Sequence, residues 1–325
     1  MPINLNEFFK ETKLVLAPLA GYTDSPFRQI AKLCGADLLV SEMISCNGLI
    51  YNEKKTMKLL KFHESERPFA IQLFGNDPEL MAKAAIIVEE SGADIVDINM
   101  GCPVKKVIKN GYGSALMENP KLCGQIVNKI TRAVKIPVTV KIRAGFLDSN
   151  LTYLQVAKEV VDNGVSAITF HPRTRNEMFS GEIRMDALKE LASNYAISVP
   201  IIGNGNIDSL KTAQKMISET GVKGLMVGRA AIGNPLIFRD LRQGLGPELS
   251  KEMQEKEIFH MICEHFSLHR SYYSIKSGIF KFRKHLHKYI KGIEGAAKLR
   301  NQLMYIEDPK DLEEFIKTNF DKIGN

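Results

Sequence analysis

Residues 138–173 read VTVKIRAGFLDSNLTYLQVAKEVVDNGVSAITFHPR, and the fold prediction depends on this stretch. It begins with a β-rich apolar run, 138–145, and ends with a second such run, 167–173. Between them, residues 153–163 have the apolar spacing of an amphipathic helix and stop before Gly164, a residue type common just past a helix end. Two such runs joined by one helix predict a β-α-β unit with parallel strands.

The same alternation extends in both directions from this unit. Eight short apolar runs lie between residues 14 and 229, namely 14–18, 38–43, 69–75, 94–101, 138–145, 167–173, 200–205 and 224–229. Eight strands separated by helices favour a (β/α)8 TIM barrel over an open, doubly wound sheet. We therefore predict an α/β fold with a barrel over residues 1–245.

The pattern changes after about residue 244, where strand-like runs end. Helical patterns follow at 251–270, 275–291, 296–305 and 309–319, with Gly and Pro between them. They predict a small all-helical C-terminal domain over residues 246–325.

Composition excludes several classes of protein. The chain is 44% hydrophobic and 25% charged, as is typical of globular proteins. No apolar run approaches the roughly 18 residues needed to cross a bilayer, and the N-terminus lacks the pattern of a signal peptide. The five cysteines are scattered, without CxxC or Cys/His ligand spacing, so neither a disulfide framework nor a structural metal site is predicted. We expect a cytoplasmic monomer without a membrane partner.

The net charge of +7 is concentrated near the C-terminus. From Arg270 to Arg300 there are nine basic residues and one acid, Glu294, which gives +8 and leaves −1 for the other 294 residues. A charge run is most simply a solvated helix face. This one is interleaved with aromatic residues, which favours a surface that binds RNA. The basic residues chosen as contacts are Arg283, Lys284 and Lys288, and the interleaved rings are Tyr272, Tyr273, Phe280, Phe282, His285 and Tyr289.

Polar residues gather at the predicted strand ends, where TIM barrels place their active sites. Gly205 and Asn206 follow the seventh strand, and Gly228 and Arg229 follow the eighth. Each pair precedes a helix, which is how such barrels hold a phosphate, although tight turns alone would also explain the glycines.

Lys141 and Cys102 are the two reactive candidates at these ends. Lys141 lies in an apolar strand, so its charge needs an anionic or electron-rich partner: a Schiff-base role, a place beside a flavin and a plain salt bridge all fit. Cys102 follows the fourth strand in a loop shaped by Gly and Pro, where a thiol could act as a nucleophile or a proton donor.

A cationic opening is expected around these residues. Arg143, His171, Arg173 and Arg175 end the fifth and sixth strands beside Lys141. Such a group suits an anionic ligand, either a phosphate-bearing cofactor or an RNA backbone.

In combination, seven motifs resemble the tRNA-dihydrouridine synthase family of the bacterial kind, nearest its B-type branch. The resemblance runs from Leu14 to the C-terminal helices. The motifs are APLAGYTDSPFR (17–28), AIQLFG (70–75), DINMGCPVKKVIKNGYGSALM (97–117), VKIRAGF (140–146), FHPRTR (170–175), IIGNGNI (201–207) and VGRAAIGNP (227–235). One departure is Asn206, where the family often has aspartate.

The resemblance implies an FMN enzyme that uses NADPH to reduce the C5=C6 bond of selected uridines in tRNA. Hydride would pass from flavin N5 to C6, and Cys102 would give the proton to C5. Asn99 matches the residue near the target base. The implied FMN contacts are Pro18, Leu19, Ala20, Gln72, Lys141 and His171, with Asn204, Gly205, Asn206, Gly228 and Arg229 around the phosphate.

Two other functions remain open at this point. One is a flavin-free barrel lyase or aldolase that uses Lys141 as a Schiff base. The other is a non-catalytic barrel that binds RNA.

Overall fold

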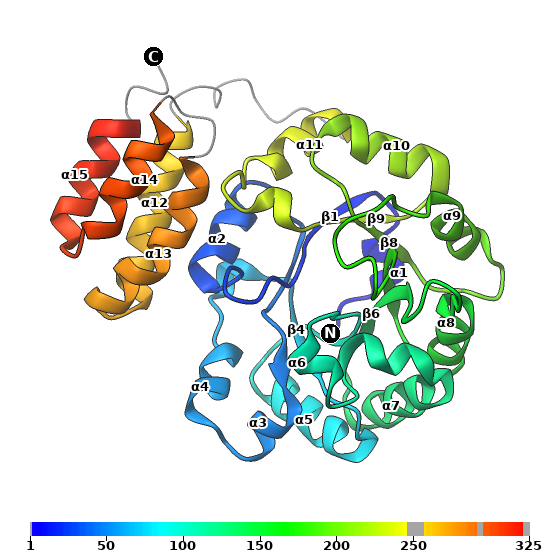
Figure 1. Cartoon of the computed structure of the whole chain (residues 1–325). Coiled ribbons are helices and arrows are strands. Elements are labelled where there is room, and N and C mark those ends of the chain that lie inside the picture. Colours follow the sequence, from blue (N-terminus) through cyan, green and yellow to red (C-terminus); the bar gives the residue numbers. More distant parts are fainter. Residues whose placement is uncertain (1, 246–256, 291–294, 321–325) are drawn as a thin grey trace.

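The computed structural model describes residues 2–245, 257–290 and 295–320. A closed barrel of parallel strands is at its centre, and Figure 1 looks down it. The strands are β1 (Lys13–Leu16), β2 (Leu38–Val40), β3 (Ile44–Ser45), β4 (Phe69–Phe74), β5 (Ile95–Met100), β6 (Val138–Gly145), β7 (Ala167–Thr174), β8 (Ile201–Asn204) and β9 (Gly224–Val227). Their order is β2-β1-β9-β8-β7-β6-β5-β4-β3, and pairing of β2 with β4 closes the ring. The TIM-barrel prediction is confirmed.

Each predicted strand run overlaps one of these strands, because a buried parallel strand is apolar along its length. The two-residue strand β3 was not predicted. It pairs only with β4, Ile44 opposite Leu73, and continues the wall of the barrel beyond β2.

Helices surround the strands and protect their outer faces. They are α2 (Ser25–Leu33), α3 (Cys46–Ile50), α4 (Lys54–Met57), α5 (Pro78–Glu90), α6 (Lys105–Ile108), α7 (Pro120–Ala133), α8 (Tyr153–Asp162), α9 (Met185–Ser193), α10 (Leu210–Thr220) and α11 (Ile237–Leu245). Four short 3-10 helices join them: η1 (Lys58–Leu60), η2 (Glu64–Glu66), η3 (Gly113–Glu118) and η4 (Arg229–Ala231). Local sequence sets their starts: Asp24 and Asp77 cap α2 and α5, and each helix has proline in its first turn.

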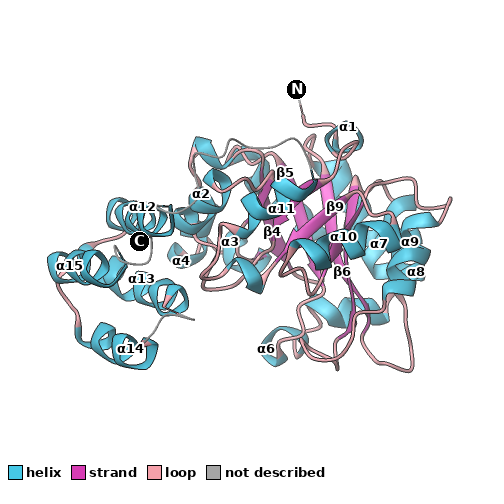
Figure 2. Cartoon of the chain, turned by 90° about the horizontal axis from the view of Figure 1, so that it is seen from above, coloured by secondary structure: helices cyan, strands magenta, loops and turns pink. Residues whose placement is uncertain are grey.

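The helix α1 (Leu5–Phe8) closes the end of the barrel at which the strands begin. Leu5 and Phe9 are buried there against strand residues such as Val15, Ile95 and Met226. Figure 2 shows α1 at one end of the barrel and α6, which follows β5, at the other. The open end is therefore the one at which the strands finish, and we call it the mouth.

The C-terminal helices are α12 (Glu257–Tyr272), α13 (Ile275–Tyr289), α14 (Ala296–Tyr305) and α15 (Pro309–Phe320), and together we call them the helical bundle. It has a core of its own, which includes Phe282, Leu286, Leu312 and Ile316. The bundle lies beside α2 (Figure 1), and α12 packs against that helix. Part of the first predicted helix, 251–256, lies outside the described residues, and the domain limits 1–245 and 246–325 stay a prediction. No described helix is long and apolar enough to span a membrane.

Candidate active site at the barrel mouth

Cys102 is held in a tightly bonded loop just past β5. The side-chain oxygen of Asn99 accepts hydrogen bonds from the N–H groups of Gly101 (3.2 Å) and Cys102 (2.9 Å). The carbonyl of Cys102 accepts from the backbone N–H of Ser114 (3.1 Å) and from its hydroxyl (2.9 Å). A Cβ at Gly113 would lie 2.8 Å from that carbonyl, so the close approach of the two segments requires glycine. The loop therefore fixes the position of the thiol.

Partial burial raises the pKa of the Cys102 thiol above its ordinary value of 9.0, although nearby Arg143 and Lys141 act in the opposite direction. The thiol is therefore protonated at neutral pH. A protonated thiol can donate a proton, whereas a nucleophilic cysteine needs a lowered pKa. Of the two roles predicted for Cys102, the electrostatics favour the acid.

A chain of buried amides and acids lies below this loop. Asn99 donates to the side-chain oxygen of Gln72 (2.7 Å), and Gln72 donates to Asp97 (2.7 Å), which also accepts from the Thr139 hydroxyl (2.6 Å). Gln72 is fully buried and Asn99 is 7% exposed. Their side chains bond to each other in this structure, and the predicted contacts of Gln72 with a flavin and of Asn99 with a base stay predictions.

Lys141 brings a cation into the mouth with an amide as its hydrogen-bond partner. Its ammonium group donates to the side-chain oxygen of Asn204 (2.9 Å), whose amide donates to the carbonyl of Met226 (2.7 Å). Burial, followed by repulsion from Arg143, lowers the pKa of Lys141 from 10.5 to about 7. An anionic neighbour would reverse part of this shift, so the site is electrostatically suited to an anion.

His171 lies among four cations. Burial is the largest cause that lowers its pKa well below 6.5, and the charges of Lys141, Arg143, Arg173 and Arg229 add to it. His171 is therefore neutral near pH 7. His171 therefore adds no positive charge to the mouth at this pH, unlike the lysine and arginines with which the sequence grouped it, because burial and the neighbouring charges suppress its protonation.

The arginines of the mouth differ in exposure. Arg143 and Arg173 are 2% exposed and bond to backbone carbonyls, Arg143 to Gly101 (2.8 Å) and Arg173 to Gly181 (3.1 Å). Arg175 is half-buried over the Phe146 ring, and Arg229 is exposed over Phe179. The exposed part of the cationic opening is therefore smaller than predicted, because Arg143 and Arg173 are buried by their hydrogen bonds to backbone carbonyls.

The predicted phosphate turn follows β8. Gly205 and Asn206 both have positive φ, +126° and +49°. A Cβ at Gly205 would lie 3.0 Å from the His171 ring, so glycine lets the backbone pass close to that ring. The side-chain oxygen of Asn206 accepts from Arg173 (3.0 Å). This bond needs only an oxygen acceptor, which asparagine supplies as well as the family's aspartate would.

The loop after β1 lies beside the turn that follows β9, because β1 pairs with β9. Leu19 folds it back, because its carbonyl accepts from the N–H groups of Tyr22 (2.9 Å) and Thr23 (3.0 Å). Pro18 is half-buried, and Ala20 is exposed. At this end of the barrel, the cations and the turn at Gly205 suit a ligand with an anionic phosphate.

The basic segment is only partly a surface. Phe282, His285 and Tyr289 are buried and cannot stack on RNA, whereas Phe280 is 71% exposed. Sequence patterning did not anticipate this because the bundle takes its core from α13.

The three basic residues of α13 that were predicted to contact RNA also differ in exposure. Arg283 donates to the carbonyl of Ile306, and Lys284 lies half-buried over the Tyr22 ring. Lys288 is exposed, as are Lys281 on the same helix and Lys298 on α14.

Sequence reasoning missed one group of residues, of which it named only His285, as a ring for stacking on RNA. Asp24, His265, His269 and His285 come together where α2 meets α12 and α13. The spacing of His265 and His269, four residues apart on one helix face, was the available signal.

Comparison with known proteins agrees with the motifs. The sequence matches the family described as Dihydrouridine synthase (Dus) over residues 15–323. It is 38% identical over 310 residues to "tRNA-dihydrouridine synthase B" of Pasteurella multocida (strain Pm70), covering 95% of this chain and 93% of that protein. It is 36% identical over 324 residues to the protein of the same name from Pectobacterium carotovorum, covering 99% and 100%.

Solved structures add the fold alone. The chain resembles morphinone reductase in complex with tetrahydroNAD with a TM-score of 0.53 and 14% identity, over 77% of this chain and 92% of that one. On the strength of the full-length sequence matches, the chain belongs to the dihydrouridine synthase family.

Proposed function

We propose that this protein is a tRNA-dihydrouridine synthase that binds FMN, takes electrons from NADPH and reduces selected uridines of tRNA to 5,6-dihydrouridine. The observation that carries the proposal is the pairing of a protonated thiol, Cys102, with a group of cations at the same end of the barrel. The names of the relatives, which specify dihydrouridine synthesis on tRNA, support the same reaction.

The chain offers contacts for each part of FMN. The turns at Gly205–Asn206 and Gly228–Arg229 would hold the phosphate, as loops after the last two barrel strands commonly do. Pro18, Leu19 and Ala20 would lie along the ring system, with Gln72 and His171 as further polar contacts. Lys141 and its partner Asn204 would stand at the ring edge, where a cation favours added negative charge.

Bound and reduced FMN would supply a hydride to C6 of the uracil ring. The resulting enolate must then gain a proton at C5, and Cys102 is the donor that the chain offers. Asn99 acts as a positioning residue, because it bonds to the N–H of Cys102 (2.9 Å) and so holds the loop. The raised pKa keeps the proton on sulfur until the carbon becomes basic enough to take it.

The target base has to leave its stack to reach such a site, so the protein must hold folded RNA around the mouth. We propose that residues 1–245 form the catalytic domain and residues 246–325 the tRNA-binding domain. Figure 2 shows α14 at the level of α6, which is at the mouth end of the barrel. Arg175 and Arg229 would extend the RNA contacts onto the barrel. We further propose that the protein acts as a cytoplasmic monomer.

The lowered pKa of Lys141 also fits a second function, that of a lyase or aldolase that forms a Schiff base. A lysine with a pKa near 7 could also form a Schiff base with a carbonyl substrate. Borohydride reduction in the presence of carbonyl compounds would then attach the substrate covalently at Lys141. We expect no such adduct, because membership of the dihydrouridine synthase family favours a charge role for this residue.

The direct test uses purified protein, FMN, NADPH and tRNA transcribed without modifications. We expect stoichiometric retention of FMN, NADPH oxidation, and dihydrouridine in the digested tRNA by mass spectrometry. A colourless protein that retains no FMN on reconstitution would refute the cofactor assignment. Retention of FMN and tRNA without any dihydrouridine would refute the reaction.

A further inference from the structure

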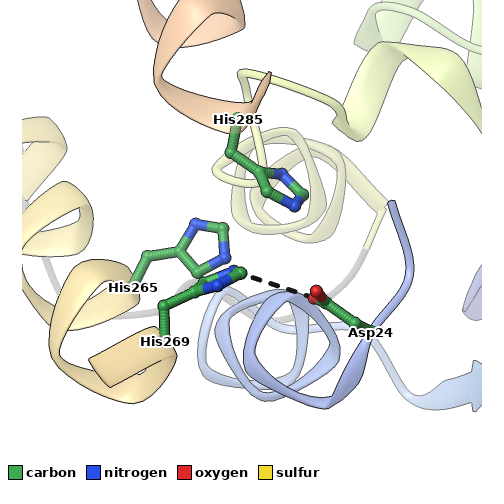
Figure 3. A group of neighbouring side chains, drawn as sticks. All are labelled: Asp24, His265, His269 and His285. Atoms are coloured by element: carbon green, nitrogen blue, oxygen red, sulfur yellow. Dashed lines mark ion pairs between the residues drawn. The ribbon is translucent and has the colours of Figure 1, made fainter. Parts of the chain in front are cut away.

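We propose that Asp24, His265, His269 and His285 bind a divalent transition-metal ion, with zinc the best match, and that this ion clamps the helical bundle to the barrel. The inference is independent of the proposed reaction. We call these four residues the histidine cluster. They come from two parts of the molecule: Asp24 lies in the loop between β1 and α2, and the histidines lie on α12 and α13 (Figure 3).

The donor atoms are close enough for one ion. One ligand atom from each residue lies within 4.8 Å of all the others, and His269 Nε2 lies 3.8 Å from an Asp24 oxygen. Tetrahedral zinc with bonds of about 2.0–2.1 Å separates its ligands by about 3.4 Å. Small side-chain rotations would bring the four atoms to that spacing.

Five of the six ring nitrogens of the cluster lack a hydrogen-bond partner within the described residues. All three histidines are fully buried. His265 Nε2 and both ring nitrogens of His269 and of His285 have no hydrogen-bond partner in the described part of the chain. Buried polar atoms are normally bonded, so this group of unpaired nitrogens points to a missing ligand. One ion would bind three of the five, one from each ring.

Hydrogen bonds outside the cluster orient two of its members. His265 Nδ1 is 2.9 Å from the Tyr289 hydroxyl, which leaves Nε2 directed to the cluster. One oxygen of Asp24 accepts from the Tyr273 hydroxyl (3.0 Å), and the other faces His269. Such outer partners are characteristic of metal sites, where they fix the tautomer and angle of each ligand.

The protonation states also fit metal binding. Burial lowers the pKa of His269 to about 4 and that of His285 to about 3, so both rings are neutral at pH 7. Burial raises the pKa of Asp24, but Lys284, the Tyr273 hydroxyl and, once they are protonated at low pH, His269 and His285 lower it further, so the carboxyl group is ionised at pH 7. Three imidazoles and one carboxylate form a donor set that zinc accepts.

The surrounding charges are mixed. Lys284 and Lys281 act on His269 and would oppose a cation, whereas the Glu42 carboxylate, which lies near both Asp24 and Lys284, would favour it. An ion bound by Asp24 and three neutral rings would keep a net charge of +1. The opposing lysines therefore weaken the site, and direct coordination by four ligands has to outweigh them.

The clamp would act on the loop that borders the proposed flavin site. Asp24 lies four residues after Ala20 and caps α2 through the N–H of Phe27 (3.3 Å). His285 stacks on the Phe27 ring at 5.1 Å between centroids, which continues the contact between the bundle and the barrel. An ion at this point would fix the bundle relative to the barrel mouth.

The test measures metal in the whole protein, with neither tRNA nor FMN needed. The chain is produced in medium supplied with Zn²⁺, or with Co²⁺ in its place, so that a buried site can fill during folding. Metal per chain is determined by mass spectrometry of the element. We expect one ion per chain, and the visible absorption of tetrahedral Co²⁺ in the cobalt sample.

The variants distinguish this site from other metal-binding positions. Asp24→Asn removes a ligand but keeps a good helix cap. This variant and His269→Gln should each lower the amount of bound metal at least tenfold. The matched control is His287→Gln, because His287 is an exposed histidine on α13. This variant should retain the ion. Retained FMN or an unchanged circular dichroism spectrum shows that each variant is folded.

Two results would overturn the proposal. Wild-type protein without bound zinc or cobalt would show that the cluster is a packed group of neutral rings. Equal metal in wild type, Asp24→Asn and His269→Gln would place the ion elsewhere. In the supporting case, removal of the metal by a chelator also lowers the melting temperature of the wild type but not that of His269→Gln.

Discussion

Cys102 combines two properties at one atom: a position at the mouth, and a thiol that burial keeps protonated. The position follows from hydrogen bonds to Asn99 and Ser114, and the protonation state follows from desolvation. Neither property requires the nearby cations, which act against protonation. The residue is therefore suited to give up a proton only when a strong base forms next to it.

We predict that Cys102→Ala retains FMN and tRNA binding but loses dihydrouridine formation by about 10²–10⁴-fold, the usual contribution of a general acid. Single-turnover reduction of unmodified tRNA by the pre-reduced protein measures it. Cys34→Ala is the control, since Cys34 is another half-buried thiol, with its pKa raised to about 12, on the far end of α2. Equal rates for Cys102→Ala and wild type would remove Cys102 from the acid role.

The pKa of Lys141 predicts a pH effect on cofactor binding. Folding lowers this pKa from 10.5 to about 7, so FMN-free protein loses the charge as the pH rises through 7. FMN affinity should fall over that range in the wild type and be weaker and flat with pH in Lys141→Met. Quenching of FMN fluorescence between pH 6 and 9 measures both; a matching pH slope in the variant would contradict the role of this charge.

The same shift affects stability with a definite sign. Between pH 7 and 10.5, Lys141 is more often protonated in the unfolded chain than in the folded one. The stability of the FMN-free protein therefore gains from Lys141 as the pH rises through that window. Lys141→Met removes the buried charge and should remove this part of the pH dependence. Thermal melts of both FMN-free proteins at pH 7 and 9 check it.

Sequence could place these residues but not their environments. Strand ends in a barrel predict which residues meet, and Lys141 does lie within electrostatic reach of both Cys102 and His171. The neutrality of His171 and the inward bonds of Arg143 could not be predicted. They depend on burial and on carbonyls from other strands, which no local pattern encodes.

At the scale of the elements, α1 has a purely structural task. Phe9, at its end, is 2% exposed, and a Cβ at Gly224 would lie 2.8 Å from its ring. The ring fills the closed end of the barrel, away from the mouth.

We therefore predict that Phe9→Ala lowers the free energy of unfolding by about 3–5 kcal/mol, the usual loss for a buried phenylalanine. FMN affinity of the folded fraction should not change. Urea denaturation and FMN titration measure the two quantities. A loss of affinity in fully folded protein would contradict the separation of the two barrel ends.

The helices α13 and α14 carry the exposed lysines of the basic segment. We predict that Lys281→Glu, Lys288→Glu and Lys298→Glu together weaken tRNA binding and reduce the slope of log affinity against log salt by about two to three. NADPH oxidation without tRNA should stay unchanged. Filter binding at several salt concentrations measures the affinity.

A matched triple variant controls for net charge. Lys83, Lys121 and Lys189 are exposed on α5, α7 and α9, on the barrel away from the bundle (Figure 1). Their reversal to glutamate should leave most of the affinity in place. An equal loss in both triples would show that only total charge matters.

The predicted boundaries of helices and strands agree with the structure where the apolar residues follow a single periodicity. The strands β6 and β7 and the helix α14 begin at the predicted residues, because apolar runs and helical spacing are unambiguous there. The role of α13 was harder to predict. Its aromatic residues alternate between core and surface, so Phe282 is buried and Phe280 is exposed, and only the packing of α12 and α15 decides which is which.

Over the whole molecule, the uneven charge separates two tasks. The segment from Arg270 to Arg300 has a net charge of +8, whereas the other 294 residues together sum to −1. The histidine cluster lies between the two parts, at α2. Family and fold could be inferred from sequence, since the motifs are long and ordered, whereas the cluster depends on residues more than two hundred positions apart.

The most direct measurement maps dihydrouridine in tRNA from cells with and without this protein. We predict that dihydrouridine disappears from one or more tRNA positions in its absence, and that the wild-type chain restores it whereas Cys102→Ala does not. Unchanged dihydrouridine at every tRNA position in cells that lack the protein would contradict the proposed function.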